Sequence, residues 1–205
     1  MRSPRAAHPT DRTADRYGRV AMLLHWTIAA AIIGLLAAGT LMVRLEPGSS
    51  LQFTLYQAHK SLGITVLALG VVRLIWRLTH RPPPLPATLR PWEALLARLT
   101  HGGFYVLMLA MPISGWLMIS ASAWNFPTVI FGAFTLPHLP VPGTPEERKA
   151  IEDALKDVHE ILAFGMVGLL VLHVAGALKH QFILRDDTLW RMLPGRRRRA
   201  REEDR

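Results

Sequence analysis

The sequence predicts an all-α integral membrane protein, a four-helix transmembrane bundle with both termini on the cytoplasmic side. Half of the 205 residues are hydrophobic, and the mean hydropathy is +0.22. The apolar residues fall into four long, charge-poor runs, each long enough to cross the hydrocarbon core as a helix. The Lys and Arg residues gather on one side of these runs, which sets their direction across the membrane.

The element boundaries follow from where charges and prolines interrupt the apolar runs. The chain divides into a polar tail at 1–16, a transmembrane domain at 17–194 with spans at about 20–43, 55–78, 97–121 and 157–178, and a basic tail at 195–205. Pro112 and Gly115 are expected to bend the third span.

Two segments beside the fourth span also carry helix signals. Before it, Thr144, Pro145 and Glu147 form a capping-box start, so residues 144–157 are either a surface helix or lead directly into the span. After it, HQFILRDDTLWRMLPG at 180–195 is expected to form an interfacial amphipathic helix.

Positive charge fixes the expected orientation. Of the 24 Lys and Arg residues, nineteen lie in the two terminal segments and the 73–98 region, and five lie in the loops on the other side. Both termini are therefore predicted to be cytoplasmic. The run Arg196 to Arg199 is expected to rest on anionic lipid headgroups rather than on nucleic acid, because it follows a membrane span.

The absence of cysteine narrows the possible cofactors. It excludes disulfides, cysteine-ligated iron–sulfur clusters, thiolate zinc sites and the covalent attachment of c-type haem. Any metal must be held by His, Met or carboxylate, and the methionines are expected to pack rather than to ligate.

Four histidines pair by depth in the membrane. His159 and His173 are fourteen residues apart in the fourth span, which is a rise of about 21 Å on nearly one helix face. The topology places His25 level with His173 near the cytoplasmic face, and His59 level with His159 near the outer face. Ionisable groups inside a membrane are costly, so these four are predicted to be functional.

Two imidazoles at each of two levels, in a chain without cysteine, indicate two bis-histidine haem b groups. Zinc would need a third or fourth ligand, which neither level shows. His101 is also near the cytoplasmic face. It could replace His25 or His173, contact a haem propionate or a quinone, or pack at the interface.

The remaining polar residues have weaker expectations. Candidate propionate partners are Arg16, Arg19, Arg73 and Arg77 for the inner haem and Lys60 for the outer one. His180 is interpreted as an interfacial residue. His8, His80 and His138 fall in polar or proline-rich segments and are predicted to be solvated.

Several stretches together resemble the bacterial cytochrome b561 family over residues 17–194. These are YGRVAMLLHW at 17–26, AHKSLG around His59, THGGFYVLMLAMPISGW at 100–116, DVHEILAFGMVGLLVLHVAGALKHQF at 157–182 and RDDTLWRMLP at 185–194. The resemblance implies a multi-pass protein of the bacterial inner membrane with two b haems ligated by His25, His59, His159 and His173. It implies ubiquinone as a redox partner, and His101 also matches a histidine of the family pattern.

Three functions are compatible with these residues. The first is a dihaem cytochrome that exchanges electrons with quinone, in one version as a superoxide:quinone oxidoreductase. The second is an electron-conduit subunit of a membrane dehydrogenase or hydrogenase. The third is a haem-free anchor or metal transporter that uses the histidines for Zn²⁺ or Cu.

Overall fold

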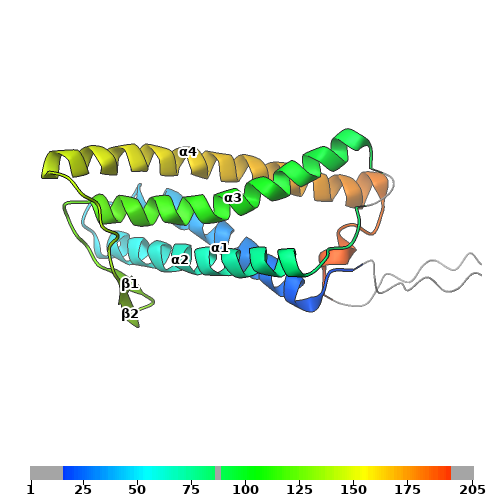
Figure 1. Cartoon of the computed structure of the whole chain (residues 1–205), viewed down its shortest axis with the longest axis horizontal. Helices are drawn as coiled ribbons and strands as arrows, with labels where there is room; N and C mark the ends of the chain where they lie inside the picture. Colours follow the sequence, from blue (N-terminus) through cyan, green and yellow to red (C-terminus); the bar gives the residue numbers. More distant parts are fainter. Residues whose placement is uncertain (1–15, 86–88, 195–205) are drawn as a thin grey trace, which may run out of the picture.

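Four long helices dominate the computed structural model, which describes residues 16–85 and 89–194 (Figure 1). They are α1 (Arg19–Met42), α2 (Ser50–Thr79), α3 (Pro91–Ala121) and α4 (Pro145–Leu178). Each is long and apolar enough to cross a membrane, so the predicted four-helix bundle is confirmed. Arg196 to Arg199 and His8 lie outside the described residues.

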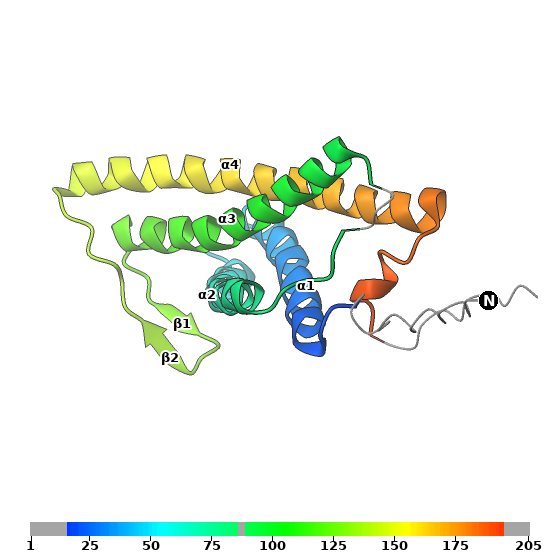
Figure 2. The same ribbon diagram turned by 45° about the vertical axis from the view of Figure 1, so that its right-hand side comes forward.

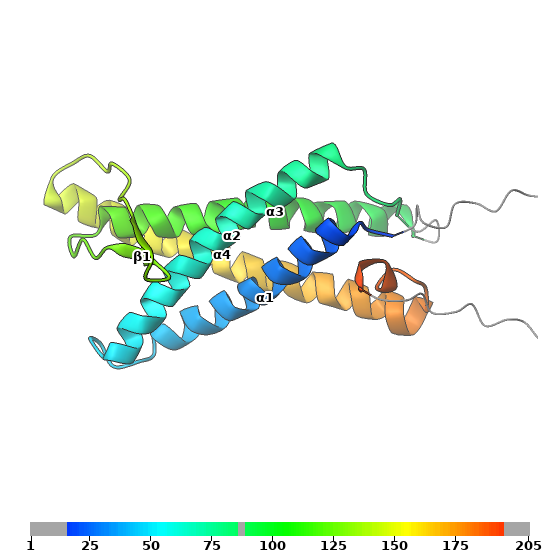
Figure 3. The ribbon, with the colours of Figure 1, turned by 90° about the horizontal axis from the view of Figure 1, so that it is seen from below.

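The helices pack as two antiparallel pairs. α1 packs on α2 and α3 packs on α4, and the pairs meet mainly where α2 contacts α3. Seen from below, α1 and α2 run obliquely across α3 and α4 (Figure 3). Over the described residues α1 touches α4 much more sparsely than it touches α2. α3, which contains Pro112, is bent as predicted (Figure 2).

A small core lies at the middle of the bundle. Its buried residues are Ile28, Ile32, Val66, Leu107, Met108 and Met166. Met166 is seven residues from both His159 and His173 and is 2% exposed. Many other large apolar side chains point outward, including Ile161 and Phe164 on α4, as expected where lipid is the solvent.

Both described ends of the chain meet at one end of the bundle, here called the terminal end. Arg16 donates a hydrogen bond to the Leu193 carbonyl at 2.6 Å, and the Trp26 indole donates to the Met192 carbonyl at 2.8 Å. The first and last described residues therefore lie at the same end of the bundle, and the cytoplasmic location of the termini stays a prediction. The opposite end is called the hairpin end.

The segment before the fourth span leads directly into it. α4 begins at Pro145, and the predicted capping box is present: the Thr144 N–H donates to Glu147 Oε2 at 2.8 Å, and the Glu147 N–H donates to Thr144 Oγ1 at 3.3 Å. Of the two predicted alternatives, residues 144–157 are thus the first turns of one long helix.

The prediction of a separate amphipathic helix after the fourth span is wrong. α4 continues as a π-helical stretch, η1 (Lys179–Leu184), and ends at Arg185, whose φ is 54°. A single 3-10 turn, η2 (Trp190–Met192), follows. After Arg185 the chain turns back, and the carbonyls of Met192 and Leu193 accept hydrogen bonds from Trp26 and Arg16 near the start of α1.

A two-stranded hairpin, β1 (Thr128–Ile130) and β2 (Phe134–Leu136), was not predicted within the proline-rich segment. It hangs beside the bundle at the hairpin end (Figures 1 and 2). Its attachment is to α2. Ser61 Oγ lies 3.1 Å from the Val129 carbonyl and accepts a hydrogen bond from the Phe131 N–H at 3.1 Å.

Candidate cofactor sites

His25 on α1 and His173 on α4 face each other at the terminal end, and are called the terminal pair. Their ring centroids are 6.0 Å apart, with an angle of 64° between the ring planes. Both residues are half-buried. The two helices that carry them barely touch elsewhere, so the imidazoles project across the seam between the helix pairs.

His59 on α2 and His159 on α4 face each other towards the hairpin end, and are called the hairpin pair. Their ring centroids are 6.4 Å apart at an angle of 67°, and both residues are half-buried. The structure therefore brings together the same two pairs that the depth argument matched. α4 contributes one member to each.

The spacing of both pairs suits one metal ion held between two imidazoles. A metal–imidazole bond of about 2.0 Å, plus about 1.1 Å from the ring nitrogen to the ring centre, predicts centroids about 6.2 Å apart. The observed 6.0 and 6.4 Å bracket this value. Within the described residues there is no group of three or more His, Cys, Asp or Glu side chains placed to hold a metal, whereas a zinc site usually has at least three protein ligands.

Two glycines leave space for the imidazole rings of the hairpin pair. A Cβ atom on Gly39 of α1 would lie 3.3 Å from Cε1 of His59, and a Cβ atom on Gly115 of α3 would lie 3.2 Å from Cε1 of His159. Both distances are shorter than ordinary carbon–carbon contacts. Each imidazole is therefore seated against bare backbone of the helix packed beside its own.

The Nδ1 atoms of the paired histidines have different surroundings. Ser114 Oγ lies 2.9 Å from His159 Nδ1, and Arg73 Nη2 lies 3.3 Å from His25 Nδ1. His59 Nδ1 is buried without a hydrogen-bond partner among the described residues. A polar atom left unsatisfied in a membrane interior is costly, which is consistent with a site that is completed by a bound group.

His101 is brought to the terminal pair as a third imidazole. Its ring centroid is 5.4 Å from that of His173, and Phe104 packs edge-on to the same ring at 5.5 Å. His101 is exposed, whereas His25 and His173 are half-buried. It is close enough to exchange roles with His25, so the alternatives predicted for it stay open.

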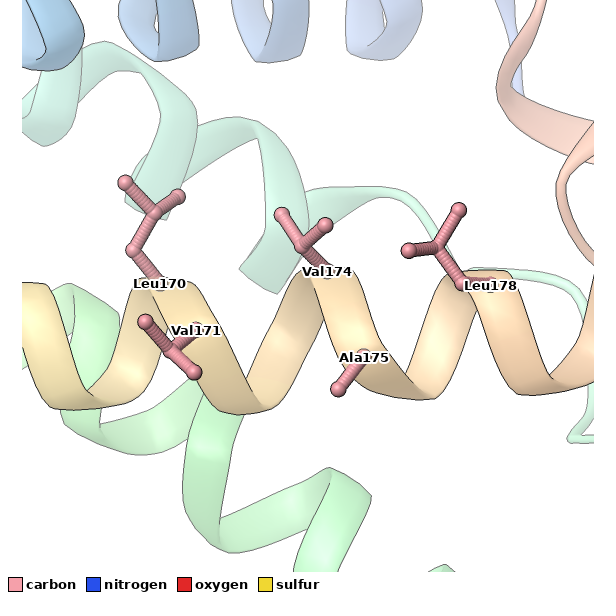
Figure 4. Close-up of a pocket in the computed structure, with 5 residues that line it drawn as sticks. All are labelled: Leu170, Val171, Val174, Ala175 and Leu178. Carbon is pink, nitrogen blue, oxygen red and sulfur yellow. The ribbon is translucent and has the colours of Figure 1, made fainter.

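An aliphatic groove of about 370 Å³ runs along α4 beside the terminal pair (Figure 4). It is lined by Leu170, Val171, Val174, Ala175 and Leu178. Val174 directly follows His173, so the groove lies at the depth of the terminal pair but on a different side of α4.

Most of the side chains that were predicted to contact haem propionates are bonded to other groups or exposed. Lys60 donates to the Pro127 carbonyl at 2.9 Å, and Arg16 is bonded to the C-terminal segment. Arg19 and Arg77 are exposed. Of the five candidates, Arg73 is bonded to one of the paired histidines, and it also donates to the Ala21 carbonyl at 3.3 Å.

The histidines outside the pairs differ in their surroundings. His80 is exposed and stacks on Trp76, as expected for a solvated residue. The prediction that His138 is solvated is wrong, because both of its ring nitrogens are buried. The loop is held against the end of α3, where the Leu139 N–H donates to Ser120 Oγ at 2.9 Å. Sequence carried no signal for that contact.

His180 is tied into the C-terminal segment rather than free at the interface. Its Nδ1 lies 2.6 Å from Asp186 Oδ2, and Asp186 Oδ1 accepts from the Thr188 N–H at 2.9 Å. Partial burial alone would raise the pKa of the Asp186 carboxyl. The hydrogen bonds from Thr188 and His180 outweigh that effect and hold the pKa below its ordinary value.

A membrane helix bundle with facing imidazoles at two levels belongs to the class of proteins that hold a metal cofactor between their spans. The chain matches prokaryotic cytochrome b561 over residues 16–195 and belongs to that family. It is therefore a bacterial multi-pass membrane protein, a b-type cytochrome that takes part in electron transfer.

Curated relatives align over most of their length. Cytochrome b561 homolog 2 of Escherichia coli is 38% identical over 182 residues, covering 88% of this chain and 93% of the relative. A probable superoxide oxidase, CybB, of Yersinia pestis is 29% identical, covering 89% of this chain and 98% of the relative. Cytochrome b561 homolog 1 of Escherichia coli is 29% identical, covering 89% and 99%.

Proposed function

We propose that the protein is a dihaem b-type cytochrome of the cytoplasmic membrane that exchanges electrons with quinone. The terminal pair would hold one haem and the hairpin pair the other. The observation that supports this most is that two imidazole pairs, at 6.0 and 6.4 Å, share one helix at two depths. Bound haem supplies the one-electron redox chemistry, and two axial histidines favour electron transfer over oxygen binding.

The chain's own residues separate and shape the two sites. Fourteen residues of α4 set the two levels about 21 Å apart along the helix axis. Buried Met166 and the core around it fill the bundle between them, so the interior is apolar and water is kept out. A low-dielectric setting of this kind is one of the main controls on haem potential.

Arg73 has a second role in this proposal. Its N–H donates towards His25 Nδ1, which requires the hydrogen of that imidazole to be on Nε2. A histidine that gives Nε2 to iron needs its hydrogen on Nδ1. We therefore expect the Arg73 guanidinium to turn away from His25 when haem binds, and to pair with a propionate carboxylate at the terminal level.

The orientation follows from charge. The terminal end carries most of the Lys and Arg residues, so we place it in the cytoplasm and the hairpin end outside. The relative named as a probable superoxide oxidase suggests superoxide as one electron donor. Two superoxide anions would each give up one electron and leave as O₂. One quinone would take the two electrons and two protons to become quinol.

Half-buried Lys60 suits that donor. It adjoins His59 and puts a positive charge beside the hairpin pair. A cation at the mouth of a site raises the local concentration of a small anion. Lys60→Gln should then slow reduction by superoxide without changing the haem content. Equal rates for the two proteins would exclude a role of Lys60 in attracting the anion. If superoxide fails to reduce the wild-type protein, superoxide is removed as the substrate and the dihaem proposal stays intact.

The central experiment is a reduced-minus-oxidised spectrum of the purified chain with haem counted per polypeptide. We expect two b haems in the wild type and one in each of the variants His159→Ala and His173→Ala. The axial ligand of the other level serves as the internal control in each case. A single substitution that empties both levels would contradict two independent sites, and a chain with no Soret band would overturn the proposal.

An electron-conduit subunit of a membrane dehydrogenase or hydrogenase is the alternative within the same family. It predicts the same spectrum but no turnover by the isolated protein. Reduction of quinone by the purified chain with superoxide as sole donor would exclude that alternative. The haem-free transporter predicts no Soret band, so a Soret band in the same spectrum would exclude it.

A further inference from the structure

Ser114 is the polar neighbour of His159, and it lies within the last two turns of α3. It is 5% exposed, and its Oγ lies 2.8 Å from the Met111 carbonyl and 2.9 Å from His159 Nδ1. A serine hydroxyl carries one hydrogen. The Met111 carbonyl can only accept, so that hydrogen points to it, and the serine oxygen is left to accept from the imidazole.

This arrangement favours one tautomer of His159. In that tautomer the ring hydrogen is on Nδ1, where Ser114 can accept it, and the lone pair is on Nε2. The Met111 carbonyl is a second acceptor beside the ring. Gly115, which follows Ser114 on α3, is where a Cβ would press on Cε1 of the same ring at 3.2 Å. One turn of α3 therefore fixes both the position of the ring and the nitrogen that is offered as a ligand.

The other paired histidines lack an equivalent contact among the described residues. His59 Nδ1 has no hydrogen-bond partner, and His25 Nδ1 faces the donor Arg73. At the His173 ring the contacts within residues 16–85 and 89–194 are with other rings, those of His25, His101 and Phe104. Among the described residues, His159 is thus the paired histidine whose Nδ1 lies beside a side-chain hydroxyl.

We propose that Ser114 is a positioning residue for the hairpin-level haem. By accepting the Nδ1 hydrogen of His159, it fixes the ligand tautomer. It thereby lowers the reduction potential of that haem below the value that the same haem has in a chain without the hydroxyl. This inference rests on the proposed dihaem function. An acceptor on Nδ1–H makes the imidazole a stronger electron donor through Nε2. Stronger donation stabilises the ferric form more than the ferrous form.

The test is a redox titration of the full-length wild-type protein and the variants Ser114→Ala, Ser114→Thr and Ser114→Cys. The haem component that disappears in His159→Ala identifies the hairpin level. Ser120→Ala is the control, because Ser120 is also a buried serine of α3 whose hydroxyl bonds the carbonyl four residues before it. Its other partner is the Leu139 N–H of the loop rather than a paired histidine.

In Ser114→Ala we expect the ferrous-to-ferric ratio of the hairpin-level haem, at a fixed ambient potential, to rise at least threefold. That equals a positive shift of about 30 mV for a one-electron couple. The terminal-level haem should not move. Ser114→Thr should restore the wild-type potential, since its hydroxyl can bond the same carbonyl. Ser114→Cys should fall between Ala and Ser, because sulfur is a weaker acceptor.

Haem content and the low-spin EPR signal provide readouts beyond activity. Loss of the hairpin-level haem in Ser114→Ala, with retention in Ser114→Thr, also supports the proposal, because outer-shell partners typically contribute about 10–100-fold to metal affinity. Loss in both variants overturns it, since the hydroxyl would then not be the cause.

Other outcomes also overturn the inference. These are an unchanged potential in Ser114→Ala, an equal shift in Ser120→Ala, or a negative shift, which direct capture of the Nδ1 hydrogen by the Met111 carbonyl would give. Each of them leaves two haems bound and so leaves the proposed function standing. A wild-type chain without haem overturns both.

Discussion

The attachment of the outer hairpin to α2 gives a measurable prediction that needs no cofactor. Ser61 is 1% exposed, and its Oγ accepts the hydrogen bond of the Phe131 N–H at 3.1 Å. Ser61→Ala removes that acceptor and leaves the amide unpaired. Leaving a buried donor unsatisfied costs about 1–3 kcal/mol, which is an increase of about 5- to 150-fold in the population of the detached hairpin.

Amide hydrogen exchange of the protein in nanodiscs measures this change directly. The Phe131 amide should exchange about 5- to 150-fold faster in Ser61→Ala. The Ala133 amide donates to the Ile130 carbonyl within the hairpin turn at 2.9 Å and provides the internal reference. Thr65→Ala is the control variant, because the Thr65 hydroxyl bonds only the carbonyl of Ser61 in its own helix.

Exchange of the Phe131 amide at the wild-type rate in Ser61→Ala would show that Ser61 does not hold the hairpin on α2. Acceleration of that amide to the same extent in Thr65→Ala would show that the effect comes from α2 as a whole. An equal acceleration of the Ala133 amide would show that the hairpin unfolds rather than detaches as a unit.

Three further perturbations test other parts of the structure. Gly115→Ala places a Cβ 3.2 Å from His159, so it should weaken haem retention at the hairpin level alone, whereas Gly168→Ala, with nothing within 4 Å, should not change the haem count. Thr144→Ala removes the cap of α4 and should destabilise its first turn by about 1 kcal/mol, seen as about fivefold faster exchange of the first-turn amides. Because the folded state lowers the pKa of Asp186, its contribution is present at neutral pH and is lost as the pH falls below about 4. Exchange in the C-terminal segment should rise over that range, and Asp186→Asn should abolish the transition.

Sequence predicted the parts of the structure that depth and periodicity control. Long apolar runs must be helices in lipid, and a fourteen-residue spacing puts two imidazoles on one face, so the partners of His159 and His173 followed from topology alone. The capping box at Thr144 was likewise local, since all of its groups lie within one turn.

Contacts between distant segments were beyond that reasoning. The π-helical end of α4 and the reversal at Arg185 depend on bonds to α1, more than 160 residues away in the chain. In the sequence Ser114 is one more small residue near Pro112. Its contact with His159 exists only because α3 packs on α4. The β-branched and aromatic residues around Gly132 were a weak hairpin signal, and the acceptor that holds the hairpin is on another helix.

The sparse contact between α1 and α4 has a consequence for biogenesis. Without a prosthetic group, α4 packs mainly on α3 among the described residues, and only the segment that follows it is hydrogen-bonded to the start of α1. The two histidine pairs join α4 to α1 and to α2, so haem loading would be the last step of assembly and would close the seam. In a haem-starved cell the newly made chain would keep that seam open, with α4 more accessible to the proteases that survey the membrane.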